Sequence, residues 1–137
     1  MDIFALTVSA ILVLIGLVHF YWALGGKAGI DKAIPTLEGR PLFQPGRVMT
    51  FAVGLTLIGF AYIAYAFQFT GINSGFIVLS GWVISGIFLL RALGEFNAIG
   101  FFKKIKATDF AWYDTMFYSP LSLFISIVFG ILAYSRI

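Results

Sequence analysis

The chain contains no cysteine, only one histidine and few charged residues: 6 are acidic and 9 are basic in a length of 137. Without cysteine there is no disulfide, no thiol nucleophile and no cysteine-based metal site. One histidine and so few carboxylates leave little for metal ligation, so we expect neither a metal site nor a cofactor. Charged residues make up 11% of the chain, against about 25% in soluble domains. This scarcity argues against an ordinary soluble fold.

Apolar residues are correspondingly abundant, at 61% of the chain, and 18% of all residues are aromatic. Soluble domains are roughly 45–50% apolar, and a soluble fold of this size could not bury the excess, whereas lipid can surround it. We therefore predict an all-α integral membrane protein whose single domain covers residues 1–137. The net charge of +3 does not indicate a nucleic-acid partner, because the basic residues flank apolar segments, where positive charge usually sets topology.

Four apolar segments are long enough to cross the hydrocarbon core of a bilayer, which is about 30 Å thick and needs about 20 helical residues. The predicted spans of this four-helix bundle cover approximately residues 3–24, 48–69, 76–93 and 113–134. No basic residue precedes the first span, and it is longer than the roughly 7–15 apolar residues of a signal peptide. We expect it to remain as the first membrane helix.

The start of the fourth span has two interpretations. Ser119 and Pro120 could form an N-cap followed by proline at the first helical position, but the membrane segment would then be short. Alternatively, the helix begins near Thr108 and Asp109 and kinks at Pro120, whose nitrogen has no hydrogen to donate. We favour the second interpretation because it gives a span of ordinary length.

The basic residues predict the orientation of the chain. All of them except Arg136 lie in or beside two long connections, residues 25–46 and 94–112, whereas the short connection at 70–75 carries no charge. Cytoplasmic loops of membrane proteins are enriched in lysine and arginine. We therefore predict that both long loops are cytoplasmic and that both termini face outside.

Small residues recur at helical spacing on three predicted spans, where they would allow close approach of neighbouring helices. These ridges consist of Thr50, Gly54 and Gly59 in the second span, Gly81 and Ser85 in the third, and Ser122, Ser126 and Gly130 in the fourth. We expect them to pack within the chain, although the pattern would equally suit a homo-oligomer or a larger membrane complex.

Ionisable side chains gather at one depth on the loop side of the predicted bundle. At 1.5 Å per residue, His19 lies about 24 Å into the first span and Arg91 about 22 Å into the third. Arg47 and Asp114 lie near the same boundary of the other two spans. Helical spacing of three or four residues adds partners on the same faces. The candidate site residues are therefore His19, Trp22, Arg47, Arg91, Glu95, Asp114 and Tyr118.

Charges embedded in a membrane usually turn inward and pair. We therefore expect Arg91 to pair with Glu95 or Asp114, and His19 to hydrogen-bond within this polar layer. A purely structural interpretation stays open. Arg91 could extend to lipid headgroups, Glu95 could simply end the third helix, and a lone histidine near a helix end commonly makes a structural hydrogen bond.

Three sequence strings in these regions resemble one family. They are HFYWALGG at residues 19–26, LRALGEF at 90–96 followed by GFFK at 100–103, and DTMFYSPL at 114–121. Over nearly its whole length the chain is similar to small four-span bacterial membrane proteins that are grouped as a domain of unknown function. The resemblance implies a multi-pass protein of the bacterial inner membrane, and it implies no particular activity.

Sequence motifs leave the choice between binding and catalysis open, because there is no Ser-His-Asp order, metal-ligand spacing or phosphate loop. We favour binding of a small amphipathic molecule, or of a membrane partner, at the polar layer. The alternative is a small membrane enzyme in which His19 acts as acid or base and Arg91 holds an anionic substrate. A transporter or channel fits less well, because the second span has no ionisable residue near its middle.

Overall fold

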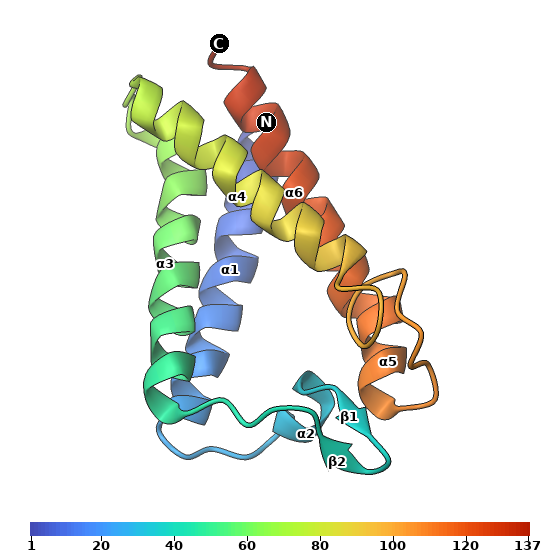
Figure 1. Ribbon diagram of the computed structural model, residues 1–137. Coiled ribbons are helices and arrows are strands. Elements are labelled where there is room, and N and C mark those ends of the chain that lie inside the picture. The colour runs from blue at the N-terminus through green and yellow to red at the C-terminus, as the bar shows by residue number, and fades with distance from the viewer.

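The computed structural model describes residues 1–137 and contains four helices that are long and apolar enough to cross a membrane (Figure 1). Three of them are single elements: α1 (Asp2–Ala23), α3 (Arg47–Phe69) and α4 (Gly75–Leu93). The fourth extends over Asp109–Tyr134. The chain is thus mostly helical, and its four apolar helices are those of a multi-pass membrane protein, as the sequence predicts.

The fourth helix begins well before Pro120 and contains a π-helical turn. It consists of α5 (Asp109–Tyr113), the π-helical segment η1 (Asp114–Tyr118) and α6 (Ser119–Tyr134). The Thr108 hydroxyl caps its first turn by accepting a hydrogen bond of 3.0 Å from the N–H of Ala111. Pro120 has no N–H to donate to the carbonyl groups of the preceding turn. The π-helical turn lies where this hydrogen bond is missing. The predicted start near Thr108 is confirmed, and the helix has a π turn just before the proline.

The helices form two antiparallel pairs, α1 with α3 and α4 with α6 (Figure 1). In the first pair, a Cβ placed on Gly54 would lie 2.7 Å from the Phe20 ring and 3.1 Å from the Gly16 carbonyl oxygen. In the second pair, the Ser85 and Ser126 hydroxyls each donate to the other residue's carbonyl oxygen at 2.8 Å. These small residues therefore bring helices together within the chain.

The two pairs converge at the end that carries both termini and separate toward the opposite end (Figure 1). One contiguous apolar core joins them, and its largest fully buried side chains are Leu12, Phe67, Ile84, Ile125, Phe129 and Leu132. Gly81 of α4 lies directly against the ring of Phe67 of α3, so the absence of a side chain there lets the pairs meet. Toward the other end, a different segment fills the space.

That segment, residues 24–46, crosses the open end of the helices, and we call it the lid (Figure 1). It contains α2 (Ile30–Ala33) and an antiparallel hairpin of two short strands, β1 (Thr36–Leu37) and β2 (Arg40–Pro41). Thr36 is opposite Pro41, and Leu37 is opposite Arg40. The all-α prediction did not include this hairpin, because two-residue strands carry no periodic pattern that sequence could reveal.

The lid is hydrogen-bonded to both helix pairs. At its beginning, the indole N–H of Trp22 in α1 donates to the Ala28 carbonyl oxygen at 2.9 Å. Further along, the Tyr118 hydroxyl of η1 donates to the Lys32 carbonyl oxygen at 3.0 Å, and the Lys32 ammonium lies 5.4 Å from the centre of the Tyr113 ring. The lid therefore bridges the gap that the diverging helices leave.

Candidate functional site

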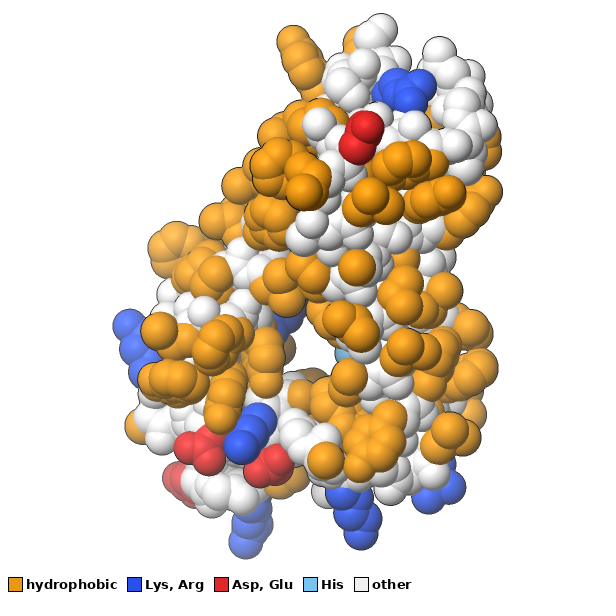
Figure 2. All heavy atoms as spheres, turned by 180° about the vertical axis from the view of Figure 1, so that it is seen from behind, with side chains coloured by type: hydrophobic (Ala, Val, Ile, Leu, Met, Phe, Trp, Pro, Cys, Tyr) orange, Lys and Arg blue, Asp and Glu red, His pale blue; other side chains and the backbone are white.

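A cavity of about 580 Å³ lies between the two helix pairs on the lid side. Its volume falls within the roughly 300–1,000 Å³ that is usual for small-molecule sites. Of its 18 lining residues, 13 are hydrophobic. Figure 2 shows that the space-filled molecule is hollowed through between the helix pairs and above the lid segment. The cavity is thus an apolar space with openings on its sides.

His19 and Trp22 form the polar part of the α1 wall of this cavity. The His19 Nδ1 lies 2.8 Å from the carbonyl oxygen of Ile15, one turn earlier. A carbonyl oxygen can only accept, so Nδ1 carries a hydrogen, and Nε2 is an acceptor whenever the ring is neutral. The Trp22 ring meets the imidazole edge to face, with centroids 5.3 Å apart. The hydrogen bond expected for His19 exists, but it stays within α1.

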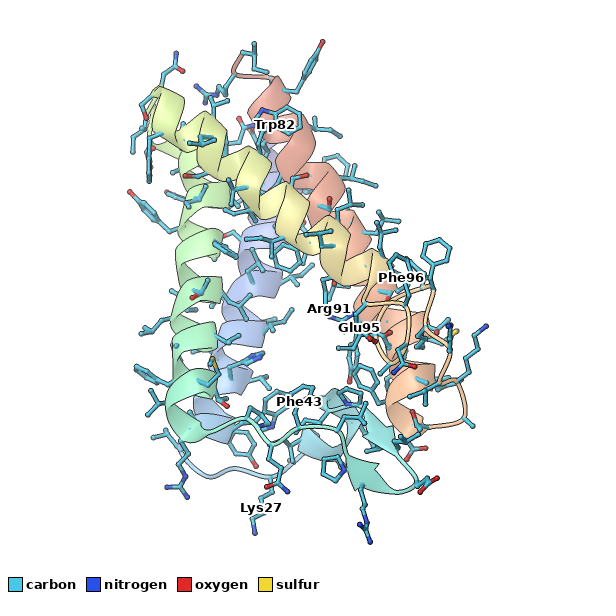
Figure 3. The ribbon with its side chains drawn as sticks, in the orientation of Figure 1. Lys27, Phe43, Trp82, Arg91, Glu95 and Phe96 are labelled. Carbon is cyan, nitrogen blue, oxygen red and sulfur yellow. The ribbon has the colours of Figure 1, made fainter.

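Arg91 supplies the polar part of the opposite wall, in the last turn of α4. Figure 3 shows its side chain beside the space that separates the helix pairs. Its Nη2 donates to Oδ1 of Asp114 at 2.8 Å, so Asp114 rather than Glu95 is its partner. The other terminal nitrogen, Nη1, is buried and has no hydrogen-bond partner. One donor group of this guanidinium is therefore buried without a partner.

Asp114 is the centre of a charge cluster behind the Arg91 wall. Its carboxylate is fully buried. Oδ1 accepts from Arg91 and, at 3.1 Å, from the Ser119 hydroxyl. Oδ2 accepts from the Gly100 N–H at 2.8 Å and lies 3.1 Å from the ammonium of Lys103. Asp114 therefore does not line the cavity, but it positions the arginine that does.

Lys103 is the member of this cluster that sequence analysis missed. Only 3% of it is exposed, and its ammonium also donates to the Gly100 carbonyl oxygen at 3.0 Å and to the Thr115 hydroxyl. In the sequence it stands in a short basic run with Lys104 and Lys106, which suggests only surface charge and topology. The structure instead separates Lys103, which is buried, from Lys104, which is exposed.

A tight loop after α4 carries Lys103 inward. Gly94 and Gly100 have φ angles of +81° and +89°, in the left-handed region that glycine tolerates. A Cβ on Gly94 would lie 1.7 Å from the Ile99 carbonyl oxygen, so the backbone crosses itself where no side chain fits. The crossing places the Gly100 N–H on Asp114. These two glycines are the sequence signal that could have indicated the loop.

Glu95 organises the same loop and does not line the cavity. Its Oε1 accepts hydrogen bonds from the N–H groups of Asn97 at 3.1 Å, Ala98, and Ile99 at 3.0 Å. The bond from Ala98 is the largest cause of a lowered pKa of the Glu95 carboxyl; desolvation opposes it, and the other two bonds add to it. Figure 3 shows Glu95 and Phe96 following Arg91 into this loop. The predicted alternative in which Glu95 pairs with Arg91 is therefore wrong.

The remaining two candidates differ in position. Tyr118 lines the cavity from η1 while its hydroxyl holds the lid. Arg47 is exposed at the start of α3, outside the cavity lining, and both ion pairs of the chain are made by Asp114 instead. The residues that the structure gathers around the cavity are thus His19, Trp22, Arg91 and Tyr118.

Side chains of the lid complete the cavity, and sequence analysis did not identify them. Ile30, Ala33, Ile34 and Phe43 line it opposite the converging helices. Figure 3 shows Phe43 in the lid, below the space that Arg91 borders. Apolar residues in an otherwise polar, glycine- and proline-containing connection were a usable signal, because a connection that runs only over the surface needs no apolar anchors.

The polar groups of the cavity suit orientation of a ligand and proton exchange with it. No group of three or more histidine or carboxylate side chains comes together to hold a metal ion. The hydroxyls of Thr50 and Ser122 donate to the carbonyl oxygens of Gly46 and Tyr118, so both already have partners. The groups left to meet a ligand are therefore the His19 ring and the Arg91 guanidinium.

Comparisons with known proteins place the chain in a family without assigning it an activity. No curated protein and no solved structure matches the chain. A family model described as "Protein of unknown function (DUF3995)" matches residues 12–129, a range that contains His19, Arg91, Lys103 and Asp114. Because this match covers most of the chain, the protein belongs to the DUF3995 family of proteins of unknown function.

Proposed function

We propose that this protein binds one small amphipathic molecule in the cavity between its two helix pairs. The observation that carries the proposal is the composition of the cavity, whose lining is hydrophobic except for a few polar groups on two facing walls. Small-molecule sites have this composition because apolar walls bury the ligand while a few polar groups fix its orientation.

The membrane setting limits what apolar contact alone can achieve. Acyl chains are as apolar as the side chains of Leu57, Phe88 and Ile125 that line the cavity, so exchanging one for the other gains little free energy. Selectivity must therefore come from shape and from the polar groups. This favours a ligand with both an apolar body and a polar head over a purely apolar one.

The openings of the cavity support entry from the lipid. The hollow between the helix pairs in Figure 2 lies among exposed hydrophobic side chains, which would face acyl chains in a bilayer. The lid, which is hydrogen-bonded to α1 and η1, covers the remaining end. A ligand that partitions into the membrane would reach the cavity without crossing the lid.

We also propose that the protein lies in the bacterial inner membrane, as the family resemblance implies, and that its basic loops place the lid and the 94–108 loop in the cytoplasm. Because the chain has no cysteine, single cysteines can report the side directly. Cysteines at Glu38 and Lys106 should react only with a reagent inside the cell, and one at Asn73 only with a reagent outside. Labelling of positions 38 and 106 from opposite sides would contradict this topology.

Native mass spectrometry of the detergent-released protein tests ligand binding. The probes are hexadecanol and hexadecanoic acid, each titrated against the full chain. We expect a saturable one-to-one adduct with at least one probe. Val53→Phe should remove the adduct because it fills part of the cavity, whereas Val18→Phe, a matched change on the exposed face of α1, should keep it.

Two outcomes of this titration would contradict the binding proposal. If neither probe forms a saturable adduct, or if Val53→Phe and Val18→Phe behave alike, the cavity is not a ligand site. Circular dichroism of both variants would establish that each keeps the helical content of the parent.

A second candidate function follows from the shared position of His19 and Arg91 on the cavity walls. His19 could exchange a proton with a ligand that Arg91 holds, which would make the protein a small membrane enzyme. Comparison of the membrane lipids of cells carrying the parent or His19→Gln tests this. A lipid that accumulates only in the variant would support catalysis. Identical lipid profiles would contradict catalysis and leave binding as the one proposed function.

A further inference from the structure

The charge cluster behind the cavity wall is not neutral. It contains the guanidinium of Arg91, the ammonium of Lys103 and the carboxylate of Asp114, which are held together at 2.8 and 3.1 Å. With all three ionised, two cations face one anion. Both ion pairs of the chain belong to this cluster, so no further carboxylate pairs with its remaining positive charge.

The surplus charge has little access to water. Lys103 is 3% exposed and Asp114 is fully buried, whereas the Arg91 side chain is 31% exposed and lines the cavity. An unpaired cation in apolar surroundings is unfavourable, and membrane proteins normally neutralise one with a partner. Arg91 is the member of the cluster through which a partner in the cavity could supply the missing anion.

The hydrogen bonding of Arg91 leaves one of its terminal nitrogens without an acceptor. Asp114 occupies Nη2, while Nη1 is buried and unpaired. A buried donor without an acceptor costs free energy, and a planar guanidinium suits the two oxygens of a carboxylate or phosphate. Across the cavity, Nε2 of His19 can accept a hydrogen bond from a protonated oxygen of the same head group whenever the ring is neutral.

We infer that the ligand is an amphiphile with one anionic head, a carboxylate or a phosphate, which Arg91 binds while the apolar body lies against Phe88, Ile125 and the lid. This inference rests on the binding function proposed above and adds the charge of the ligand to it. Lys103 balances Asp114, and Arg91 is thereby left to balance the ligand.

Four probes with the same sixteen-carbon chain test the charge directly: hexadecanoic acid, hexadecyl phosphate, hexadecanol and hexadecyltrimethylammonium. We expect the two anions to bind at least roughly tenfold more tightly than the alcohol, as one hydrogen-bonded charge pair provides, and the cation to bind least. Inorganic phosphate serves as a competitor. Its failure to displace hexadecyl phosphate is expected, and displacement would overturn the assignment to an amphiphile.

Arg91→Gln and Arg91→Lys should both bring the affinity for the acid down toward that for the alcohol. Lysine keeps the positive charge beside Asp114 but lacks the planar pair of donors, so this variant preserves the test if the glutamine variant fails to fold. Arg40→Gln makes the same change of charge on an exposed strand of the lid, outside the cavity lining, and should leave the preference intact.

Failure of this inference is distinguishable from failure of the binding function. Equal binding of acid and alcohol by the parent, or a preference that both Arg91 variants retain, would overturn the anionic head while leaving a ligand site in place. If Val53→Phe weakens the binding of none of the four probes, both the anionic head and the ligand site would be overturned.

Discussion

Arg91 and Asp114 form an ion pair of 2.8 Å that joins the end of α4 to η1, and the carboxylate is completely buried while the guanidinium reaches the cavity. The pair lies where the two helix pairs have separated, beyond the apolar core that joins them at the other end. It therefore secures the α4–α6 pair at the level where the cavity opens, and it sets the orientation of the one cation in the wall.

Asp114→Asn should destabilise the protein strongly, because it leaves the buried ammonium of Lys103 and the partly buried guanidinium of Arg91 without their anion. Breaking a buried ion pair by removal of one partner costs about 3–5 kcal/mol in the free energy of unfolding. Asp109→Asn, at an exposed position on the same helix, should change it by about 0.5 kcal/mol or less. Denaturant-induced unfolding in detergent, followed by circular dichroism, gives both values, and equal losses would show that Asp114 has no structural role.

Lys103→Gln and Lys104→Gln should differ in their effect on the free energy of unfolding, although the two lysines are neighbours in sequence. Lys103 is bonded to three acceptors in the interior, so its neutralisation should lower the free energy of unfolding by about 1.5–3 kcal/mol. Lys104 is exposed, and its side chain forms no ion pair. Amide hydrogen exchange over residues 94–108 should accelerate in the first variant only. Matching exchange in the two variants would mean that the inward position of Lys103 contributes nothing.

Composition and helical spacing predict the long helices and a few of the residues that line the cavity, namely His19, Trp22, Arg91 and Tyr118. Span length follows from the thickness of a bilayer, and the depths of His19 and Arg91 follow from the rise of a helix, so the sequence alone predicts both. Asp114 was one of two partners proposed for Arg91, and tertiary geometry decides between them. Glu95 is closer in sequence, but α4 ends at Leu93 and the chain turns at Gly94, so Glu95 no longer shares the helix face of Arg91.

The positions of Lys103 and the lid could not be predicted in the same way. Each depends on contacts between segments far apart in the chain, such as the 86 residues that separate Tyr118 from its partner Lys32. Neither segment has a periodic pattern, so propensity and hydrophobic spacing carry no information about which side faces inward. Two left-handed glycines fold Lys103 inward, and a few hydrogen bonds to Trp22, Tyr21 and Tyr118 place the lid.

Two glycines of α3 should respond oppositely to alanine. A Cβ on Gly54 would lie 2.7 Å from the Phe20 ring, within the contact between α1 and α3, so Gly54→Ala should destabilise that pair. A Cβ on Gly59 would meet no atom within 4 Å, so Gly59→Ala should raise the free energy of unfolding by about 0.5–1 kcal/mol through helix propensity. Unfolding of the two variants under one condition checks the sign of each. Stabilisation by both would place Gly54 outside a helix contact.

The order of the loop that holds Lys103 should depend on pH, because Glu95 can be protonated. Hydrogen bonds to the ionised carboxylate lower its pKa, so its contribution to loop order is present above the ordinary value of about 4.3. That contribution is lost as the pH falls through the lowered value, because protonation removes charge from the acceptor of the three N–H bonds. Amide exchange at residues 97–99, compared with Glu95→Gln at each pH, measures the effect. We expect the parent's extra protection to vanish in acid, and a pH-independent difference would contradict this mechanism.

Tyr118→Phe should loosen the lid without altering the cavity wall, because phenylalanine keeps the ring and removes only the hydroxyl that donates to Lys32. A lost neutral hydrogen bond costs about 0.5–1.5 kcal/mol, and Ile30, Ile34 and Phe43 of the lid line the cavity, so hexadecanoic acid should dissociate roughly two- to tenfold faster once the lid is loosened. Tyr113→Phe is the matched control, since its ring lies beneath the Lys32 ammonium while its hydroxyl makes no hydrogen bond. Stopped-flow displacement gives both rates. Faster amide exchange in the lid with an unchanged dissociation rate would contradict the prediction, because it would show that the lid does not help to retain the ligand.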